Sequence, residues 1–330
     1  MLAPLDVGDV TVRLRDGIEI QLSDGTRVVC DADDPSGDLA VLSHAHGDHW
    51  PDREVNAVCS AVTADLASTR REVPLHGIED DRVELLPAGH VAGSRAALIT
   101  DPDGTRYLYT GDCSPRRRYY LEGFEPPPAD VLVIEATYGE PGYEFPPTEE
   151  VVAAATEWLT ELDAPALLFG YALGRAQKLQ LLAADAGRTV YTTDAVSRVN
   201  EVIERHRPVE FGARPYERET TLGPSDAVVL PMTTARFAWV DQIVERSGAR
   251  KAGFSGWAIN SGFQYRGNYD VTFPLSDHCD FPELVSVVEQ VDPGRVYTQH
   301  GSADSLATEL TARGYEAIAL RANQTALGDF

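Results

Sequence analysis

The 330-residue sequence predicts an α/β protein in which a first domain is interrupted by an inserted α/β domain. Short strands separated by Asp-Gly turn signals dominate the first third of the chain. The middle changes to strands that alternate with amphipathic helices, which is typical of a parallel sheet covered by helices. The last part returns to strand and helix segments. We therefore expect the interrupted domain at residues 1–140 and 266–330, and an insert of ordinary domain size at residues 141–265.

The individual elements follow from apolar patterning and turn residues. Strands are expected in the first domain at residues 11–16, 18–22, 26–31, 40–44, 82–88, 95–100, 106–110 and 129–137. In the insert, strands are expected at 165–170, 189–193 and 227–231. Helices are expected to start at Thr148, Gly174 and Asp194, with Thr148 and Asp194 as N-caps.

Composition limits the class of protein. The net charge is −24 and the pI about 4.6, which taken alone argues against a nucleic-acid partner, because phosphate binding normally uses a basic face. Lys178 and Lys251 are the only lysines. An acid-rich, lysine-poor surface suits a cytoplasm with concentrated salt, where screening weakens self-repulsion. We therefore interpret the net charge as an adaptation to a salt-rich cytoplasm, and it does not exclude a nucleic-acid partner.

The chain has no sign of export or membrane insertion. The first ten residues lack the basic and apolar regions of a signal peptide, and no apolar run is long enough to cross a bilayer. The four cysteines form no C-x-x-C pair and are expected to be reduced. We expect a cytoplasmic protein.

The segment LSHAHGDHW carries the strongest chemical signal. It places His44, His46, Asp48 and His49 directly after an apolar strand. Imidazoles and a carboxylate are ligands that suit zinc, and this spacing can serve two ions. Four such residues in a core would each need a polar partner, which favours a metal site over a structural role.

Further candidate ligands also follow strands. They are His90 in PAGHVAGS, Asp112 in YTGDCS, His278 in LSDHCDF and His300 in YTQHGS. Six of the eight histidines thus lie in strand-end loops with small neighbours.

These motifs resemble the metallo-β-lactamase superfamily. The H-x-H-x-D-H segment with its later G-H and G-D elements carries that resemblance, and Glu135 in IEATYG, His278 and His300 resemble the β-CASP nuclease branch. The segments FGYALGRAQKLQ, SGWAI and LSDHCDFPEL are most similar to ligase-associated DNA exonucleases and to archaeal mRNA 3′-end processing factor-like proteins. The resemblance implies a metallo-β-lactamase αββα sandwich with an inserted α/β β-CASP domain.

The resemblance also implies roles for individual residues. One zinc ion would be held by His44, His46 and His90, a second by Asp48, His49 and His300, and Asp112 would bridge them. Asp31 would brace the metal loop, and Glu135 would orient His278 as general acid. Manganese is an alternative metal, since these ligands do not exclude it.

Weaker signals point to substrate contacts. Arg175 lies at a strand-to-helix turn that can hold a phosphate, Arg116 belongs to a basic triplet after Asp112, and Ser276 precedes the acid histidine. The alternatives are a surface arginine on a capped helix and a solvated basic turn. Trp257 is either a base-stacking ring or a core residue.

The expected function is a two-zinc nuclease that hydrolyses phosphodiester bonds, trimming DNA ends as an exonuclease. One alternative is an RNA nuclease in mRNA 3′-end processing or decay, and a second is a small-molecule metallohydrolase. A further hypothesis is a catalytically inactive binding subunit. The sequence argues against it, because it contains every metal ligand that the resemblance implies. Expected partners are a DNA or RNA substrate, with a DNA ligase, a processing complex or a second copy as candidates, and no membrane.

Overall fold

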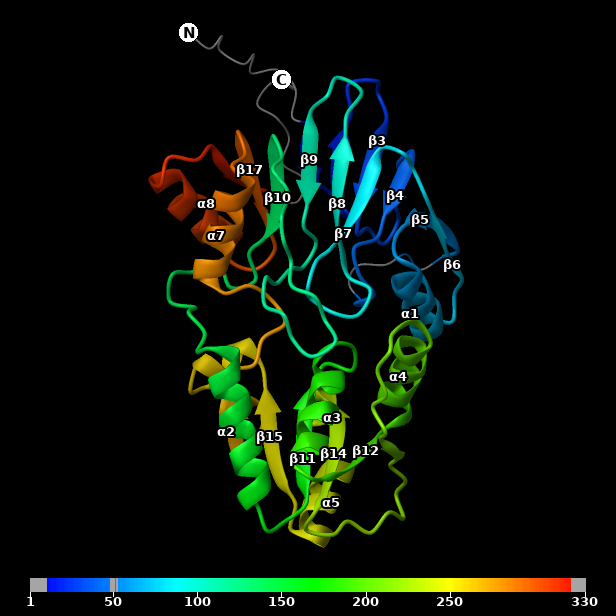
Figure 1. Ribbon diagram of the computed structural model, residues 1–330, viewed down its shortest axis with the longest axis vertical. Helices are drawn as coiled ribbons and strands as arrows, with labels where there is room; N and C mark the ends of the chain where they lie inside the picture. The colour runs from blue at the N-terminus through cyan, green and yellow to red at the C-terminus, as the bar shows by residue number, and fades with distance from the viewer. Residues whose placement is uncertain (1–10, 48–50, 52, 322–330) are drawn as a thin grey trace.

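The structure is a computed structural model that describes residues 11–47, 51 and 53–321 (Figure 1). Asp48 and His49 lie outside the described residues, so their predicted places in a metal site stay predictions. In the described part of the chain, no helix combines the length and apolar character needed to cross a bilayer.

Two mixed sheets form the upper part of Figure 1. The first has the order β1-β2-β3-β4-β5-β6. Its strands are β1 (Val12–Leu14), β2 (Ile18–Gln21), β3 (Arg27–Cys30), β4 (Leu39–Val41), β5 (Val55–Val58) and β6 (Leu75–Ile78). The second has the order β18-β17-β10-β9-β8-β7. Its strands are β7 (Val83–Pro87), β8 (Arg95–Thr100), β9 (Arg106–Tyr109), β10 (Val131–Glu135), β17 (Arg295–Gln299) and β18 (Ala317–Ala319).

A third sheet lies in the lower part of the molecule, and all its pairings are parallel. Its order is β13-β12-β14-β11-β15-β16. The strands are β11 (Ala166–Gly170), β12 (Thr189–Thr192), β13 (Arg214–Pro215), β14 (Asp226–Pro231), β15 (Arg250–Phe254) and β16 (Val271–Phe273). The whole sheet is inserted between β10 and β17, which pair with each other. Its last strand follows residue 265; the exact domain boundaries stay predictions.

Helices pack against these sheets, and the third sheet carries helices on both faces. They are α1 (Ala61–Arg71), α2 (Thr148–Glu161), α3 (Arg175–Asp185), α4 (Asp194–His206), α5 (Ala238–Ser247), α6 (Phe263–Gly267), α7 (Phe281–Val291) and α8 (Ala303–Ala312), with 3-10 turns at Met232–Thr234 and Gly256–Ile259. One apolar core joins the first two sheets face to face, and a second packs α7 and α8 on the outside of the second sheet. The predicted αββα sandwich with an inserted α/β domain is confirmed.

Local sequence explains where the helices begin. Asp280 caps α7 and forms a capping box with Glu283, which satisfies two free backbone N–H groups. The predicted N-caps at Thr148 and Asp194 were wrong by one residue: both are the first helical residues, after Pro147 and Thr193. Helix α1 was not predicted from the sequence, because its buried face consists mostly of small side chains.

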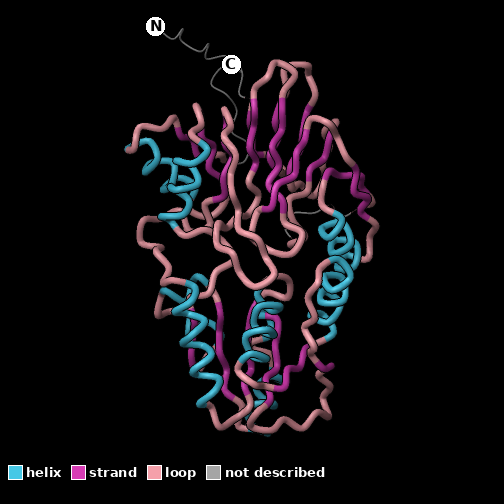
Figure 2. The backbone as a smooth tube through the Cα atoms, viewed as in Figure 1, coloured by secondary structure: helices cyan, strands magenta, loops and turns pink. Residues whose placement is uncertain are grey.

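The insert is fixed to the sandwich by an apolar core. Leu66 of α1 and Val199, Val202 and Ile203 of α4 belong to the same buried cluster, and Figure 1 shows α4 directly below α1. Figure 2 shows the loops that leave the strands of the two upper sheets gathered between the sandwich and the insert. Residues on those loops are therefore held in a fixed relation to the insert.

Candidate metal centre and active site

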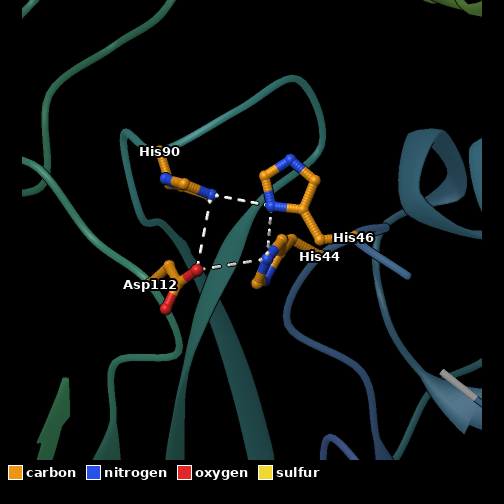
Figure 3. Close-up of side chains that lie close together, drawn as sticks. All are labelled: His44, His46, His90 and Asp112. Carbon is orange, nitrogen blue, oxygen red and sulfur yellow. Dashed lines mark hydrogen bonds and ion pairs between the residues drawn. The ribbon is translucent and has the colours of Figure 1, made fainter. Parts of the chain in front are cut away.

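Four side chains from three strand-end loops converge at this junction (Figure 3). His44 and His46 follow β4, His90 follows β7, and Asp112 follows β9. The Nδ1 atom of His46 lies 3.1 Å from His44 Nε2 and 3.2 Å from His90 Nε2. The Oδ2 atom of Asp112 lies 3.4 Å and 3.5 Å from the same two Nε2 atoms. The four donor atoms thus form a closed group.

This group fits a metal ion. Zinc–nitrogen bonds in tetrahedral sites place neighbouring donor atoms about 3.3 Å apart, which matches the spacing here. His44 and His90 are fully buried. Burial, together with His278 and His46, lowers the pKa of His90 well below its usual value, so its imidazole is neutral. Neutral imidazoles facing one another around a carboxylate are the state in which a metal binds them.

Each of the three histidines also has a partner on its other ring nitrogen. His44 Nδ1 lies 2.8 Å from Ser43 Oγ, His46 Nε2 lies 3.2 Å from the Leu173 carbonyl oxygen, and His90 Nδ1 lies 2.9 Å from the Asp277 carbonyl oxygen. Such contacts fix the ring orientation and the tautomer of metal ligands. The rings therefore present Nε2, Nδ1 and Nε2 to the centre.

Asp31 is linked to His44 through Ser43. Its carboxylate accepts hydrogen bonds from the Ser43 backbone N–H (2.7 Å), the Ser43 hydroxyl (2.5 Å) and the Tyr109 hydroxyl (2.7 Å). Gly111 makes this approach feasible, because a Cβ there would lie 2.5 Å from the Ser43 side chain. The bracing role of Asp31 stays a prediction, and the contacts add Ser43, which was not predicted from the sequence.

A buried carboxylate–histidine pair lies beside the four donors. Both Glu135 carboxylate oxygens are 3.0 Å from His278 Nδ1, and Glu135 also accepts from the Cys113 N–H (2.8 Å) and the Thr137 hydroxyl. Burial would raise the pKa of Glu135, but the charge and hydrogen bond of His278 outweigh it and lower that pKa. Burial would lower the pKa of His278, but Glu135 and Asp112 raise it. The two carboxylates therefore favour the charged form of the imidazole.

The pair and the donor group share Asp112. His278 Nδ1 lies 3.9 Å from Asp112 Oδ2, and Asp112, Glu135 and His278 form a second close group of potential ligands. His300 follows β17 and is exposed, and neither close group of described residues includes it. Its assignment to a second metal stays a prediction.

The three predicted substrate-binding residues are engaged within the protein. Arg175 is 1% exposed and pairs with Asp277 at 2.9 Å. Ser276 is buried and accepts from the His278 N–H at 3.0 Å. Arg116 pairs with two carboxylates, those of Asp280 (2.8 Å) and Glu283 (2.6 Å). Their role in substrate binding stays a prediction, and the contacts show that each has a structural one.

Asp277 is a functional candidate that the sequence analysis missed. Its carboxylate contacts Arg175, Lys178 and Arg118, and all four side chains are at most 2% exposed. Burial would raise the pKa of Asp277, but the three cations lower it; burial, with Arg118, lowers the pKa of Lys178 to about 7. One feature of the sequence could have pointed to this cluster: Lys178 is one of only two lysines in the chain. Asp277 joins the insert to the loop that carries His278.

No family model matches the sequence. The chain is 35% identical over 302 residues to "Probable DNA ligase" of Opitutus terrae, covering 87% of this chain and 29% of that protein. It is 38% identical over 119 residues to cleavage and polyadenylation specificity factor subunit 3 of Dictyostelium discoideum, covering 34% and 14%. It is 24% identical over 292 residues to the human DNA cross-link repair 1A protein, covering 77% and 27%. The chain thus spans less than a third of each relative.

A solved structure supports the fold. The crystal structure of a protein of unknown function from Enterococcus faecalis V583 matches 96% of this chain and 97% of its own, with a TM-score of 0.60 and 14% identity. The sandwich with donor side chains at its strand ends defines the metallo-β-lactamase class of protein. With the insert between β10 and β17 and the relatives above, the chain belongs to the β-CASP family of that class.

Proposed function

We propose that this protein is a metal-dependent nuclease that hydrolyses phosphodiester bonds and trims DNA ends as an exonuclease. One observation carries the proposal: the group of His44, His46, His90 and Asp112 shares its carboxylate with the buried Glu135–His278 pair. A metal centre beside a fixed imidazolium suits displacement at phosphorus, because that reaction needs both an activated water and a proton for the leaving oxygen.

We infer that the resident metal is zinc and that two ions bind. His44, His46 and His90 would hold one ion, Asp112 would bridge, and Asp48, His49 and His300 would hold the other. Bound zinc ions would polarise the phosphate and lower the pKa of water. Manganese is the alternative, since imidazole and carboxylate ligands accept it.

His278 supplies the proton for the leaving oxygen, and Glu135 determines which ring nitrogen donates it. Glu135 engages Nδ1 of His278, so the proton available for transfer is the one on Nε2. Water loses one proton to the solvent as its oxygen forms the bond to phosphorus, and the bond to the leaving oxygen breaks. His278 donates its Nε2 proton to the leaving oxygen and regains one from the solvent. Glu135 is the positioning residue, because it fixes the ring and favours its charged form.

The relatives support both DNA and RNA as substrates. The names "Probable DNA ligase" and "DNA cross-link repair 1A protein" favour DNA, and the first also favours a DNA ligase as a partner. The name "cleavage and polyadenylation specificity factor" favours the RNA alternative and a processing complex. A small-molecule metallohydrolase is the weaker alternative, because hydrolysis of a small molecule requires neither the insert nor the Glu135–His278 pair.

We further propose that the protein is cytoplasmic and halophilic, because its net charge is −24. A homodimer is a candidate assembly.

End-labelled single-stranded DNA and RNA of one sequence test the proposal, in concentrated KCl with zinc or manganese. The variants are a His44→Ala, His90→Ala double substitution and, as matched control, His76→Ala, since His76 is an exposed histidine that pairs with Glu54. We expect the wild type and the control to cut and the double variant not to cut, and the preferred strand decides between DNA and RNA. A wild type that cuts neither strand with either metal, or a double variant that cuts normally, contradicts the proposal.

A further inference from the structure

Tyr171 is an exposed aromatic residue at the rim of the metal-donor group. It lies between β11 and α3, and it is 48% exposed. Its ring centroid lies 6.1 Å from that of His46. The same loop touches the donor group through the Leu173 carbonyl oxygen, 3.2 Å from His46 Nε2. Any strand whose phosphate reaches the donors therefore passes close to this ring.

The ring of Tyr171 is supported from one side by a buried cation. The guanidinium carbon of Arg175 lies over the ring, 5.4 Å from its centroid. Arg175 is itself fixed, because it pairs with Asp277 and donates to the Phe254 carbonyl oxygen at 3.2 Å. A cation over one face holds the ring in place. The exposed surface of Tyr171 is then a preorganised platform that loses little entropy on binding.

The charge beneath the platform favours an anionic strand. Arg118 and Arg175 are two permanent cations, and both pair with the carboxylate of Asp277. A positive excess in a buried place acts over short distances even in a chain with a net charge of −24, because little water screens it. Nucleobases attached to such a strand offer the flat faces that stack on tyrosine, whatever their sequence.

We propose that Tyr171 is a stacking platform for the nucleobase next to the scissile phosphate, and that the enzyme therefore takes its substrate as a single strand. The inference rests on the proposed nuclease function and adds the form of the substrate. A base within a duplex is already stacked and paired, so it has to leave the helix before it can stack on a protein ring. Duplex ends would then be cut only as fast as they fray.

The test compares two protein forms on two strands. Wild type and Tyr171→Leu are given a single strand with normal bases and the same strand with abasic residues at the labelled end. Binding is measured by fluorescence anisotropy on phosphorothioate strands, which resist hydrolysis, and cleavage on the matching phosphate strands. We expect Tyr171→Leu to weaken binding of the normal strand about 5- to 150-fold, the usual range for one lost base–aromatic stack.

Controls separate stacking from a change of shape. Tyr171→Phe keeps the ring and is expected to bind normally. Tyr265→Leu removes another exposed tyrosine of the insert, 76% exposed on α6, and is expected to have no effect. The wild type is expected to bind the abasic strand as weakly as Tyr171→Leu binds the normal one, and Tyr171→Leu to weaken abasic binding little further.

Each outcome separates this inference from the proposed function. Equal loss on both strands would mean that Tyr171 acts through the shape of the site, and no loss on the normal strand would mean that it contacts no base; either result overturns the inference. Base-dependent binding without any cleavage would support the stacking platform and count against the nuclease. Cleavage without base-dependent binding would support the nuclease and count against the stacking platform.

Discussion

Neutralising Asp277 tests how the insert is fixed to the loop of the acid histidine. Its Oδ2 atom lies 2.9 Å from Arg175 Nη2, and its Oδ1 atom contacts Lys178 Nζ and lies 3.7 Å from Arg118 Nη1. All four side chains are at most 2% exposed. Asp277→Asn keeps the size of the side chain and removes the only negative charge in these contacts.

The expected cost is large because the cations stay buried. Removing one partner of a buried ion pair typically costs about 3–5 kcal/mol, since it leaves an uncompensated charge out of water. Lys178, whose pKa is lowered to about 7, can shed its proton. Arg118 and Arg175 cannot, because a guanidinium does not deprotonate in proteins. We therefore expect Asp277→Asn to lose about 3 kcal/mol or more of an ordinary unfolding free energy of about 5–15 kcal/mol.

Urea unfolding with a chelator present measures this loss without a contribution from metal binding. The matched control is Glu72→Gln, because Glu72 pairs with Arg198 at 3.7 Å between side chains that are 80% and 56% exposed. An exposed pair contributes about 0–1 kcal/mol. If Asp277→Asn loses no more than Glu72→Gln, the reasoning from buried charge is refuted.

Three further predictions concern the site. Ser43→Ala removes the hydroxyl between Asp31 and His44 and should weaken zinc binding about 10- to 100-fold in competition with a chromogenic chelator; an unchanged affinity would deny Ser43 any part in the centre. Glu135→Gln should lower the cleavage rate about 10²- to 10⁴-fold with the metal content unchanged, because His278 loses the carboxylate that keeps it charged; loss of metal would instead make Glu135 a ligand. Chelation should lower the melting temperature and added zinc should restore it, because an ion that binds only the folded state stabilises it; a constant melting temperature would show that no bound ion contributes.

The sequence predicted the strands that precede the four donor residues, because such strands depend on short-range patterns, but it did not predict β5, β6 or β15. His44 and His46 are two positions apart in the segment after β4. His90 and Asp112 each follow a strand that the apolar pattern of the sequence predicts. β7 and β9 both pair antiparallel with β8, so their ends lie at the same edge of the second sheet. The packing of the two sheets brings the end of β4 beside them. The close group of four donors is what such a pattern favours.

Partners from distant segments could not be predicted in this way. The Leu173 and Asp277 carbonyl oxygens that orient His46 and His90 are backbone atoms, which leave no trace in residue identity. Arg175 was expected to meet a phosphate because of its charge, but its partner is Asp277, 102 residues further along the chain. Side-chain type shows that an arginine needs an anion, and only the fold shows which one it has.

Anomalous diffraction at the zinc edge, from crystals of the full chain grown with zinc, tests the central claim most directly. The account predicts an anomalous peak bonded to His44 Nε2, His46 Nδ1, His90 Nε2 and an oxygen of Asp112. No peak at this group, in crystals that hold zinc elsewhere, would contradict the account.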